Sequence, residues 1–405
     1  MIAKIAWKNI WRNRLRSLIV IISVILGLWA GTFLLAYVFG IMDQRLEDAI
    51  GHEISHLQFH QPDFLIDNDP QYSIQNSQQI LNDLAQNEEV EAATGRVLAF
   101  GMVAAATTSS GGKFIGIEPE QEQAITQLAS TIIEGEYLKD GDKNKVVIGK
   151  KLADKLNVKI RSKVVLTFQD SEHNIVAGAF RVKGIFKSYN TSLEENNLYV
   201  SRSDLDQLLN VNGEVHEIAV LLHQSDLVPS FVSRMQRKHE DLSVRTWKQI
   251  APELALMVDS IDQYLIIFLV IILLALSFGI VNTMLMAVLE RGREIGVLMA
   301  VGMNKFRLFA MIFLETFFIV GMAAPLGLLL AYGSISYLES VGMDLSNLYA
   351  DSYGSLGFKT IIHPHLEGYY YLRILLMVTI TALLSAIYPA YTALRLDPVK
   401  AIRKI

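Results

Sequence analysis

The amino-acid sequence predicts a membrane protein with four transmembrane α-helices and a large extracytoplasmic domain inserted between the first and second helices. We expect the inserted domain to be of mixed α/β (α+β) structure with two lobes. Three observations support this fold class. The chain has four long uncharged runs, a long polar segment follows the first of them, and basic residues collect in a few short segments.

The four uncharged runs hold 26, 27, 23 and 21 residues and comprise positions 17–42, 263–289, 316–338 and 374–394. A helix of about 20 residues spans the hydrocarbon core of a bilayer. Each run is therefore long enough to cross a membrane.

The distribution of lysine and arginine predicts the orientation, because short basic loops stay on the cytoplasmic side. Five basic residues precede the first run, four lie in the loop 290–307 and four follow the last run, whereas 339–371 holds only Lys359. Both termini and the central loop are thus expected in the cytoplasm, across a bacterial inner membrane. Residues 43–261 carry 21 basic and 32 acidic side chains, a net charge of −11.

These observations divide the chain into nine segments. They are a cytoplasmic interfacial helix (1–17), transmembrane helix 1 (18–42), the extracytoplasmic domain (43–260), transmembrane helix 2 (261–289), a cytoplasmic coupling loop (290–307), transmembrane helix 3 (308–338), an extracytoplasmic loop (339–371), transmembrane helix 4 (372–394) and a cytoplasmic tail (395–405). A cleaved signal peptide is a weaker interpretation of the N-terminus, because the first apolar run is too long and no Ala-x-Ala-like site follows it.

Strand-like and helix-like patterns alternate in the inserted domain. Residues 145–148 predict a strand that leads into an amphipathic helix over 150–156, and a polar turn at 170–174 predicts a hairpin. Ser203 is expected to cap a short helix. From about Trp247 a helical pattern is expected to run without interruption into transmembrane helix 2. The chain has no cysteine, so the domain must be held by its own core.

One motif suggests metal chemistry. His52-Glu53-Ile54-Ser55-His56 satisfies the H-E-x-x-H pattern, in which a helix places two histidines on one zinc ion. The surrounding alternation up to His60 favours a strand instead, which would separate His52 from His56 by about 13 Å. We therefore expect a solvated strand face and no metal.

The sequence contains no nucleotide-binding motif, no G-x-S-x-G motif and no cysteine that could act as a nucleophile. The stretch 109–114 lacks the spacing of a phosphate-binding loop, so any ATP-driven role requires a partner chain. We expect a non-enzymatic subunit without a cofactor of its own and with no nucleic-acid partner.

Two features lie inside the apolar runs. Ser23, Gly27 and Gly31 form a ridge of small side chains, which permits close packing with a helix of this chain or of another subunit. Glu315 is an ionisable residue within a membrane segment, which suggests either a functional role or pairing with the nearby basic residues.

Three stretches resemble the ABC transporter permeases of the MacB, LolC/LolE and FtsX type. They are Glu-Arg-Gly-Arg-Glu-Ile-Gly-Val-Leu-Met-Ala-Val-Gly (290–302), Ala-Trp-Lys-Asn-Ile-Trp-Arg-Asn-Arg-Leu-Arg-Ser (6–17) and the terminal 388–403. Segments 115–120, 134–138 and 146–156 are more similar to the lipoprotein-releasing LolC/LolE group than to MacB. The turn between Phe168 and Phe180 is too short for the hook with which LolC-like subunits hold a chaperone.

The resemblance implies mechanotransmission, in which two permease subunits couple ATP hydrolysis by two cytoplasmic ATPase subunits to movement outside the membrane. ATP and Mg²⁺ would bind the ATPase. The coupling residues it implies are Glu290, Arg291, Arg293, Glu294, Ile295, Gly296, Leu298 and Gly302. Lipoprotein release is the expected function, with a second permease subunit, membrane lipids and a lipoprotein as further partners. Peptide or drug efflux, an FtsX-like regulatory role and, remotely, a membrane zinc protease remain alternatives.

Overall fold

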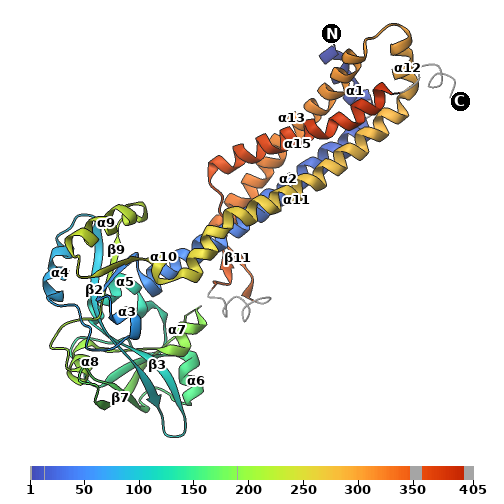
Figure 1. Cartoon of the computed structure of the whole chain (residues 1–405). Coiled ribbons are helices and arrows are strands. Elements are labelled where there is room, and N and C mark those ends of the chain that lie inside the picture. Colours follow the sequence, from blue (N-terminus) through green and yellow to red (C-terminus); the bar gives the residue numbers. More distant parts are fainter. Residues whose placement is uncertain (1, 13, 189, 347–357, 396–405) are drawn as a thin grey trace. The chain divides into compact units, whose positions relative to one another are not determined.

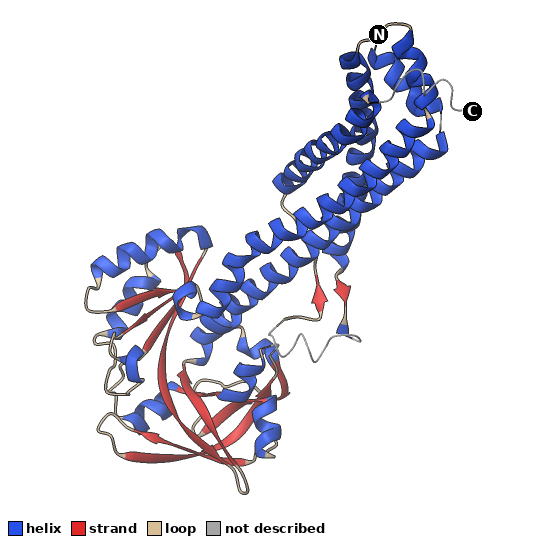
Figure 2. Ribbon diagram, turned by 45° about the vertical axis from the view of Figure 1, so that its right-hand side comes forward, coloured by secondary structure: helices blue, strands red, loops and turns tan. Residues whose placement is uncertain are grey.

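The computed structural model describes residues 2–12, 14–188, 190–346 and 358–395. The chain forms two compact units. The helical unit comprises Met1–Met42, Ser260–Asp344 and Ile361–Ile405, and the inserted unit comprises Asp43–Asp259 and Leu345–Thr360. The large sheet lies in the inserted unit, and a small two-stranded ribbon is the only sheet among the described residues of the helical unit (Figure 2).

The helical unit is built from long helices (Figure 1). Its elements are α1 (Ile2–Arg12), α2 (Arg14–Ala49), α11 (Pro252–Glu290), α12 (Gly292–Ala300), α13 (Lys305–Val341), β11 (Met343–Asp344), β12 (Ile361–Ile362) and α15 (Gly368–Leu394). Among the described residues, α2, α11, α13 and α15 are long and apolar enough to cross a membrane. The chain is therefore a multi-pass membrane protein whose inserted unit lies between the first and second spanning helices.

Small residues and hydroxyl groups hold the spanning helices together. At Gly327 of α13, an added Cβ would lie only 3.1 Å from the backbone oxygen of Ile25 in α2. Trp29 Nε1 donates a hydrogen bond to Ser334 Oγ (3.0 Å), which joins the same two helices. Such close approach and such polar contacts stabilise helix pairs in an apolar solvent, where burial of apolar surface contributes little.

A ten-stranded sheet forms the centre of the inserted unit. The strands are β1 (Leu57–His60), β2 (Val90–Ala104), β3 (Ser109–Ile117), β4 (Ile132–Gly135), β5 (Lys145–Gly149), β6 (Lys163–Gln169), β7 (Ile175–Phe186), β8 (Asn197–Ser201), β9 (Glu217–Leu222) and β10 (Ser243–Thr246). Their order is β10-β1-β9-β2-β3-β8-β5-β7-β4, and β6 pairs with β2 and β7. The pairs β3–β8 and β5–β7 are parallel, and the remaining pairs are antiparallel.

Short helices connect and cover these strands. They are η1 (Ile50–Ile54), α3 (Phe64–Asp67), α4 (Ser77–Ala85), α5 (Pro119–Thr126), η2 (Leu128–Thr131), α6 (Lys150–Leu156), α7 (Thr191–Asn196), α8 (Arg202–Leu209), η3 (Ser225–Leu227), α9 (Val228–Lys238) and α10 (Trp247–Ile250). The core they enclose includes the fully buried rings of Phe59, Phe114, Phe180 and Phe231. The predicted mixed α/β class and the short hairpin turn at 170–174 are confirmed.

Two local predictions are wrong. The cap of α8 is Ser201, not Ser203, because β8 passes into the helix with no residue between them. The helical pattern from Trp247 is also interrupted. Short helix α10 ends at Ile250, its C-cap Ala251 is not helical (φ −120°, ψ 73°), and α11 begins at Pro252. Proline has no N–H to continue the α10 ladder and disfavours helical geometry in the residue before it.

Candidate functional site

The segments that carry two of the sequence motifs meet at one end of the helical unit. Helix α1, the start of α13 and the short helix α12 lie together there (Figure 1). Of the third motif, residues 388–395 belong to α15 and its C-cap, and the rest lies outside the described residues. We take this end of the unit as the candidate functional site.

Helix α1 packs on α13 with its apolar side. Ala6 and Ile10 are buried there, and the ring of Trp7 meets the edge of Phe318 with centroids 5.6 Å apart. The hydroxyl of Ser17 donates a hydrogen bond to the carbonyl of Ile10 (2.7 Å), which fixes the bend between α1 and α2. The apolar spacing in the sequence thus produces a helix held along α13.

Helix α12 has defined ends. Arg291 occupies the N-cap position, and Gly302 follows the last turn with φ +96°, a conformation that favours glycine. The N–H of Met303 donates to the carbonyl of Leu298 (3.0 Å), which closes the helix. The side chain of Asn304 then caps α13 by accepting from the N–H of Phe306 (3.1 Å). Two sharp breaks therefore separate α12 from the long helices on either side.

Four charged side chains tie α12 to its neighbours. Arg291 Nη1 donates to both carboxylate oxygens of Glu315 on α13 (3.2 Å each), and its Nε donates to Glu294 (3.3 Å). Arg12 of α1 also donates to Glu294. Burial alone would raise the pKa of Glu294, but the hydrogen bonds from Arg12 and Arg291 outweigh it and lower that pKa. The network links α1, α12 and α13.

The other coupling residues predicted from the sequence divide into two groups. Ile295 and Gly296 are buried against the bundle, and Leu298 is half-buried. Glu290 and Arg293 are exposed. The first group packs against the bundle, whereas the side chains of the second group lie at the surface.

Exposed apolar side chains at this end were missed by the sequence interpretation. Val301 is 83% exposed and Phe306 is 75% exposed, and Val297 is exposed one turn before Val301. The exposed basic residues Lys305 and Arg307 lie beside Phe306 in the sequence. The spacing of Val297 and Val301 by four residues was a signal for one helix face, but it did not reveal which face is buried.

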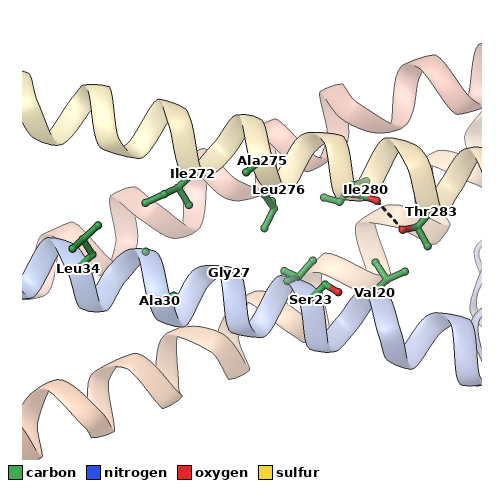
Figure 3. A pocket seen from close by; sticks show the side chains of 13 residues that line it. Val20, Ser23, Gly27, Ala30, Leu34, Ile272, Ala275, Leu276, Ile280 and Thr283 are labelled. Atoms are coloured by element: carbon green, nitrogen blue, oxygen red, sulfur yellow. Dashed lines mark hydrogen bonds between the residues drawn. The ribbon is translucent and has the colours of Figure 1, made fainter.

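The ridge Ser23, Gly27 and Gly31 faces helix α11 of the same chain. An added Cβ at Gly31 would lie 3.1 Å from the side chain of Ile272, and one at Gly27 would lie 3.5 Å from Leu276. Beside these contacts an open apolar cavity of about 450 Å³ lies between the two helices (Figure 3). Small residues of both helices line it.

The His52-Glu53-x-x-His56 motif lies in the inserted unit. The expected strand is confirmed from Leu57 to His60, which form β1. It is wrong for the motif itself, because Ile50–Ile54 form the π-helix η1 and Ser55 turns the chain with φ +61°. His52 and His56 therefore do not share one helix face. The side chain of Glu53 lies outside the described residues.

Hydrogen bonds with the backbone occupy these histidines. His52 Nδ1 donates to the carbonyl of Thr126 (2.8 Å), and His56 Nδ1 accepts from the N–H of Leu222 (3.0 Å). The expected solvated face is wrong, since β1 pairs with strands on both sides and buries His56 and His60. Where side chains are described, no group of three or more His, Asp or Glu is arranged to hold a metal ion.

Comparison with known proteins shows the family. The model of the MacB-like periplasmic core domain matches residues 17–238, and that of the FtsX-like permease C-terminal domain matches 266–398. The chain belongs to this family of ABC transporter permeases.

Named relatives agree with that class. An uncharacterised ABC transporter permease of Methanocaldococcus jannaschii is 22% identical, and the match covers 98% of this chain and 96% of that one. The lipoprotein-releasing system transmembrane protein LolC of Xylella fastidiosa is 23% identical, over 71% of this chain and 72% of LolC. The crystal structure of the periplasmic region of MacB from Actinobacillus actinomycetemcomitans aligns with a TM-score of 0.37 and 15% identity, covering 52% of this chain and 97% of that one.

Proposed function

We propose that this chain is the non-catalytic permease subunit of an ABC transporter that works by mechanotransmission. A partner ATPase binds ATP and Mg²⁺ in the cytoplasm and docks on α12, and a second permease subunit completes the assembly. Both termini and α12 lie in the cytoplasm, and the inserted unit lies outside the inner membrane. The basic residues around α1, α12 and the chain end support this orientation.

The observation that carries the proposal is the surface at α12. Exposed Val301 and Phe306, with basic residues beside them, suit a partner surface that is partly apolar and partly acidic. The network around Arg291 and Glu294 fastens α12 to α1 and α13, so a displacement of α12 carries these helices with it. Helix α11 ends directly before α12, so the coupling helix is also joined to a spanning helix by the chain itself.

Lipoprotein release is the transport function that we infer. The match to LolC over 71% of this chain supports it. The apolar cavity between α2 and α11 supports it further, because an acyl chain gains about 0.8 kcal/mol for each buried methylene group. Its lining of Gly27, Ala30 and Ala275 leaves room for such a chain (Figure 3).

The Val301→Asp variant tests the docking surface. Docking would bury the new carboxylate without a partner, so this variant should lose co-purification of the ABC ATPase. The ATPase is identified by peptide mass spectrometry through its Walker sequences. Val341→Asp is the matched control, because Val341 is also exposed and lies at the opposite end of α13. Equal ATPase recovery with wild-type protein and the Val301 variant would refute docking at α12.

A further inference from the structure

A second cavity, of about 270 Å³, lies inside the inserted unit. Strands β1, β2, β3, β8 and β9 provide one wall, and residues of η1, α5, α7 and α10 provide the other. Its volume is below the range of about 300–1,000 Å³ that is usual for drug-sized ligands. A ligand of this cavity must therefore be smaller than a typical drug-sized molecule.

One side of the cavity is a closed ion cluster. Arg96 Nε and Nη2 donate to the two oxygens of Glu122 (2.9 and 2.8 Å), and its Nη1 donates to Glu217 Oε1 (2.5 Å). Arg96 and Glu217 are cross-strand partners on β2 and β9. Glu122 is fully buried, so the bidentate pair is part of the core, and each of the three side-chain nitrogens of Arg96 already donates to a carboxylate.

Lys113 and Glu217 are different, because each lines the cavity with an atom that is not committed. Within the described part of the chain, no acceptor lies within hydrogen-bond distance of Lys113 Nζ and no carboxylate lies within 4.0 Å of it; it sits 5.8 Å from the ring of Phe100. Likewise no described donor bonds Glu217 Oε2, and His60 Nε2 lies 3.9 Å away.

The charges of Lys113 and Glu217 nevertheless interact. Burial lowers the pKa of Lys113, and the charge of Glu217 opposes that effect. Burial would raise the pKa of Glu217, but Arg96 and then Lys113 outweigh it and lower that pKa to about 2. Lys113 and Glu217 are thus close enough to interact across the cavity without forming a direct ion pair.

Charge balance indicates which ligand fits between them. Two cations, Arg96 and Lys113, face two anions, Glu122 and Glu217, and burial lowers the pKa of His60 so that it adds no charge near neutral pH. A ligand with a net charge would leave an unbalanced buried charge, which is costly. A zwitterion preserves the balance.

The rest of the lining adds a side-chain preference. Five aliphatic side chains line the cavity, those of Ile54, Leu98, Ile115, Leu193 and Ile250, together with the uncharged polar residues Gln58, Thr126, Asn190, Asn197 and Tyr199. We propose that this cavity binds an α-amino acid with an aliphatic side chain, whose carboxylate pairs with Lys113 and whose ammonium pairs with Glu217.

Calorimetric titration of the full chain in lipid nanodiscs tests the ligand class. L-leucine should bind, whereas isocaproate, which lacks the amine, and isoamylamine, which lacks the carboxylate, should bind at least about tenfold more weakly, since each leaves one buried charge unpaired. Absence of leucine binding at millimolar concentration, or equal binding of leucine and either analogue, would overturn the proposal. Neither result depends on an ATPase partner.

Variants and chemical labelling test the residues. Lys113→Met should weaken leucine binding at least about tenfold, whereas Lys163→Met, at an exposed lysine of β6, should leave it unchanged. If Lys113→Met does not fold, chemical labelling of the wild-type protein tests the same residue. Leucine should protect Lys113, and not Lys163, from an amine-acylating reagent, as read by peptide mass spectrometry. Equal acylation of Lys113 with and without leucine would contradict the assignment.

Discussion

At the scale of single residues, charge burial decides which positions matter. Glu315 is only 4% exposed and lies within an apolar helix, where an unpaired carboxylate would be strongly unfavourable. Arg291 faces it from the start of α12 with two hydrogen bonds. The pair therefore fixes where α12 sits on α13, and it accounts for an acidic residue in this helix without a catalytic role.

Replacing Glu315 by Gln tests this structural role. The amide keeps the size but leaves Arg291 facing a neutral group, so the free energy of unfolding should fall by about 2 kcal/mol. Glu339→Gln is the control, since Glu339 pairs with His365 where both side chains are nearly half exposed, and it should cost less than about 1 kcal/mol. Unfolding in mixed detergent micelles measures both, and equal losses would contradict a special role for Glu315.

His216 makes the inserted unit sensitive to acid. It is fully buried, accepts a hydrogen bond from the N–H of Leu98 (2.9 Å) and donates one to the carbonyl of Pro70 (2.9 Å). Burial lowers its pKa to about 4. The native state therefore keeps His216 neutral in a range where the unfolded chain, with a pKa of about 6.5, takes up a proton.

Stability should thus fall as the pH drops from about 6.5 towards 4, because the unfolded state binds more protons there. At pH 5 the loss due to His216 should be about 2 kcal/mol. His216→Gln retains one donor and one acceptor without titrating and should flatten this dependence, whereas His223→Gln, at an exposed position, should not. Chemical unfolding at pH 7 and pH 5 compares the three proteins, and an unchanged pH slope in His216→Gln would argue against this account.

At the scale of elements, the facing surfaces of α2 and α11 combine close contact with an opening. Gly31 brings the helices together at Ile272, and small residues nearby leave the apolar cavity beside that contact. The same ridge of small residues thus allows close helix packing and leaves the cavity beside that contact. An acyl chain in that space would lie between α2 and α11. These two helices can move together only if they remain in contact.

Filling the cavity should impair lipoprotein release without impairing ATP hydrolysis. Ala30→Trp places a large ring into the space, so release of an acylated lipoprotein by the reconstituted complex should fall strongly while its ATPase activity persists. Leu26→Trp introduces the same ring at an exposed position of α2 outside the cavity lining and should have little effect. Lipoprotein release and phosphate production are measured in the same proteoliposomes, and full release by Ala30→Trp would exclude this site for the acyl chain.

At the scale of the whole molecule, the arrangement of charge along the chain should determine its orientation in the membrane. The chain has no cysteine, so a single introduced cysteine reports its side without interference. Lys305→Cys, beside α12, should react with a membrane-impermeant maleimide only after the cytoplasmic membrane is opened. Asp226→Cys, in the inserted unit, should react as soon as the reagent reaches the outer face of that membrane. Labelling of Lys305→Cys in cells with an intact cytoplasmic membrane would reverse the proposed topology.

The class of the protein could be predicted from the amino-acid sequence, because the length and apolar content of the four uncharged runs leave few alternatives. Runs such as 263–289 are long and apolar enough to span a membrane, and the predicted helix over 150–156 matches α6 residue for residue. Local sequence rules failed at positions where a contact in space or the backbone geometry of a single residue determined the structure. Pro252 ended the expected continuous helix, and Ser201 took the cap expected at Ser203.

Which side chains meet depends on the tertiary packing and could not be predicted from local patterns. Arg12 and Glu294 are far apart in the sequence, and only the packing of α1 beside α12 joins them. Sheet pairing likewise placed Arg96 against Glu217 and buried histidines that alternation had suggested were solvated. Periodicity specifies that one face of an element is buried, but the identity of the opposing element depends on long-range packing, which no local pattern encodes.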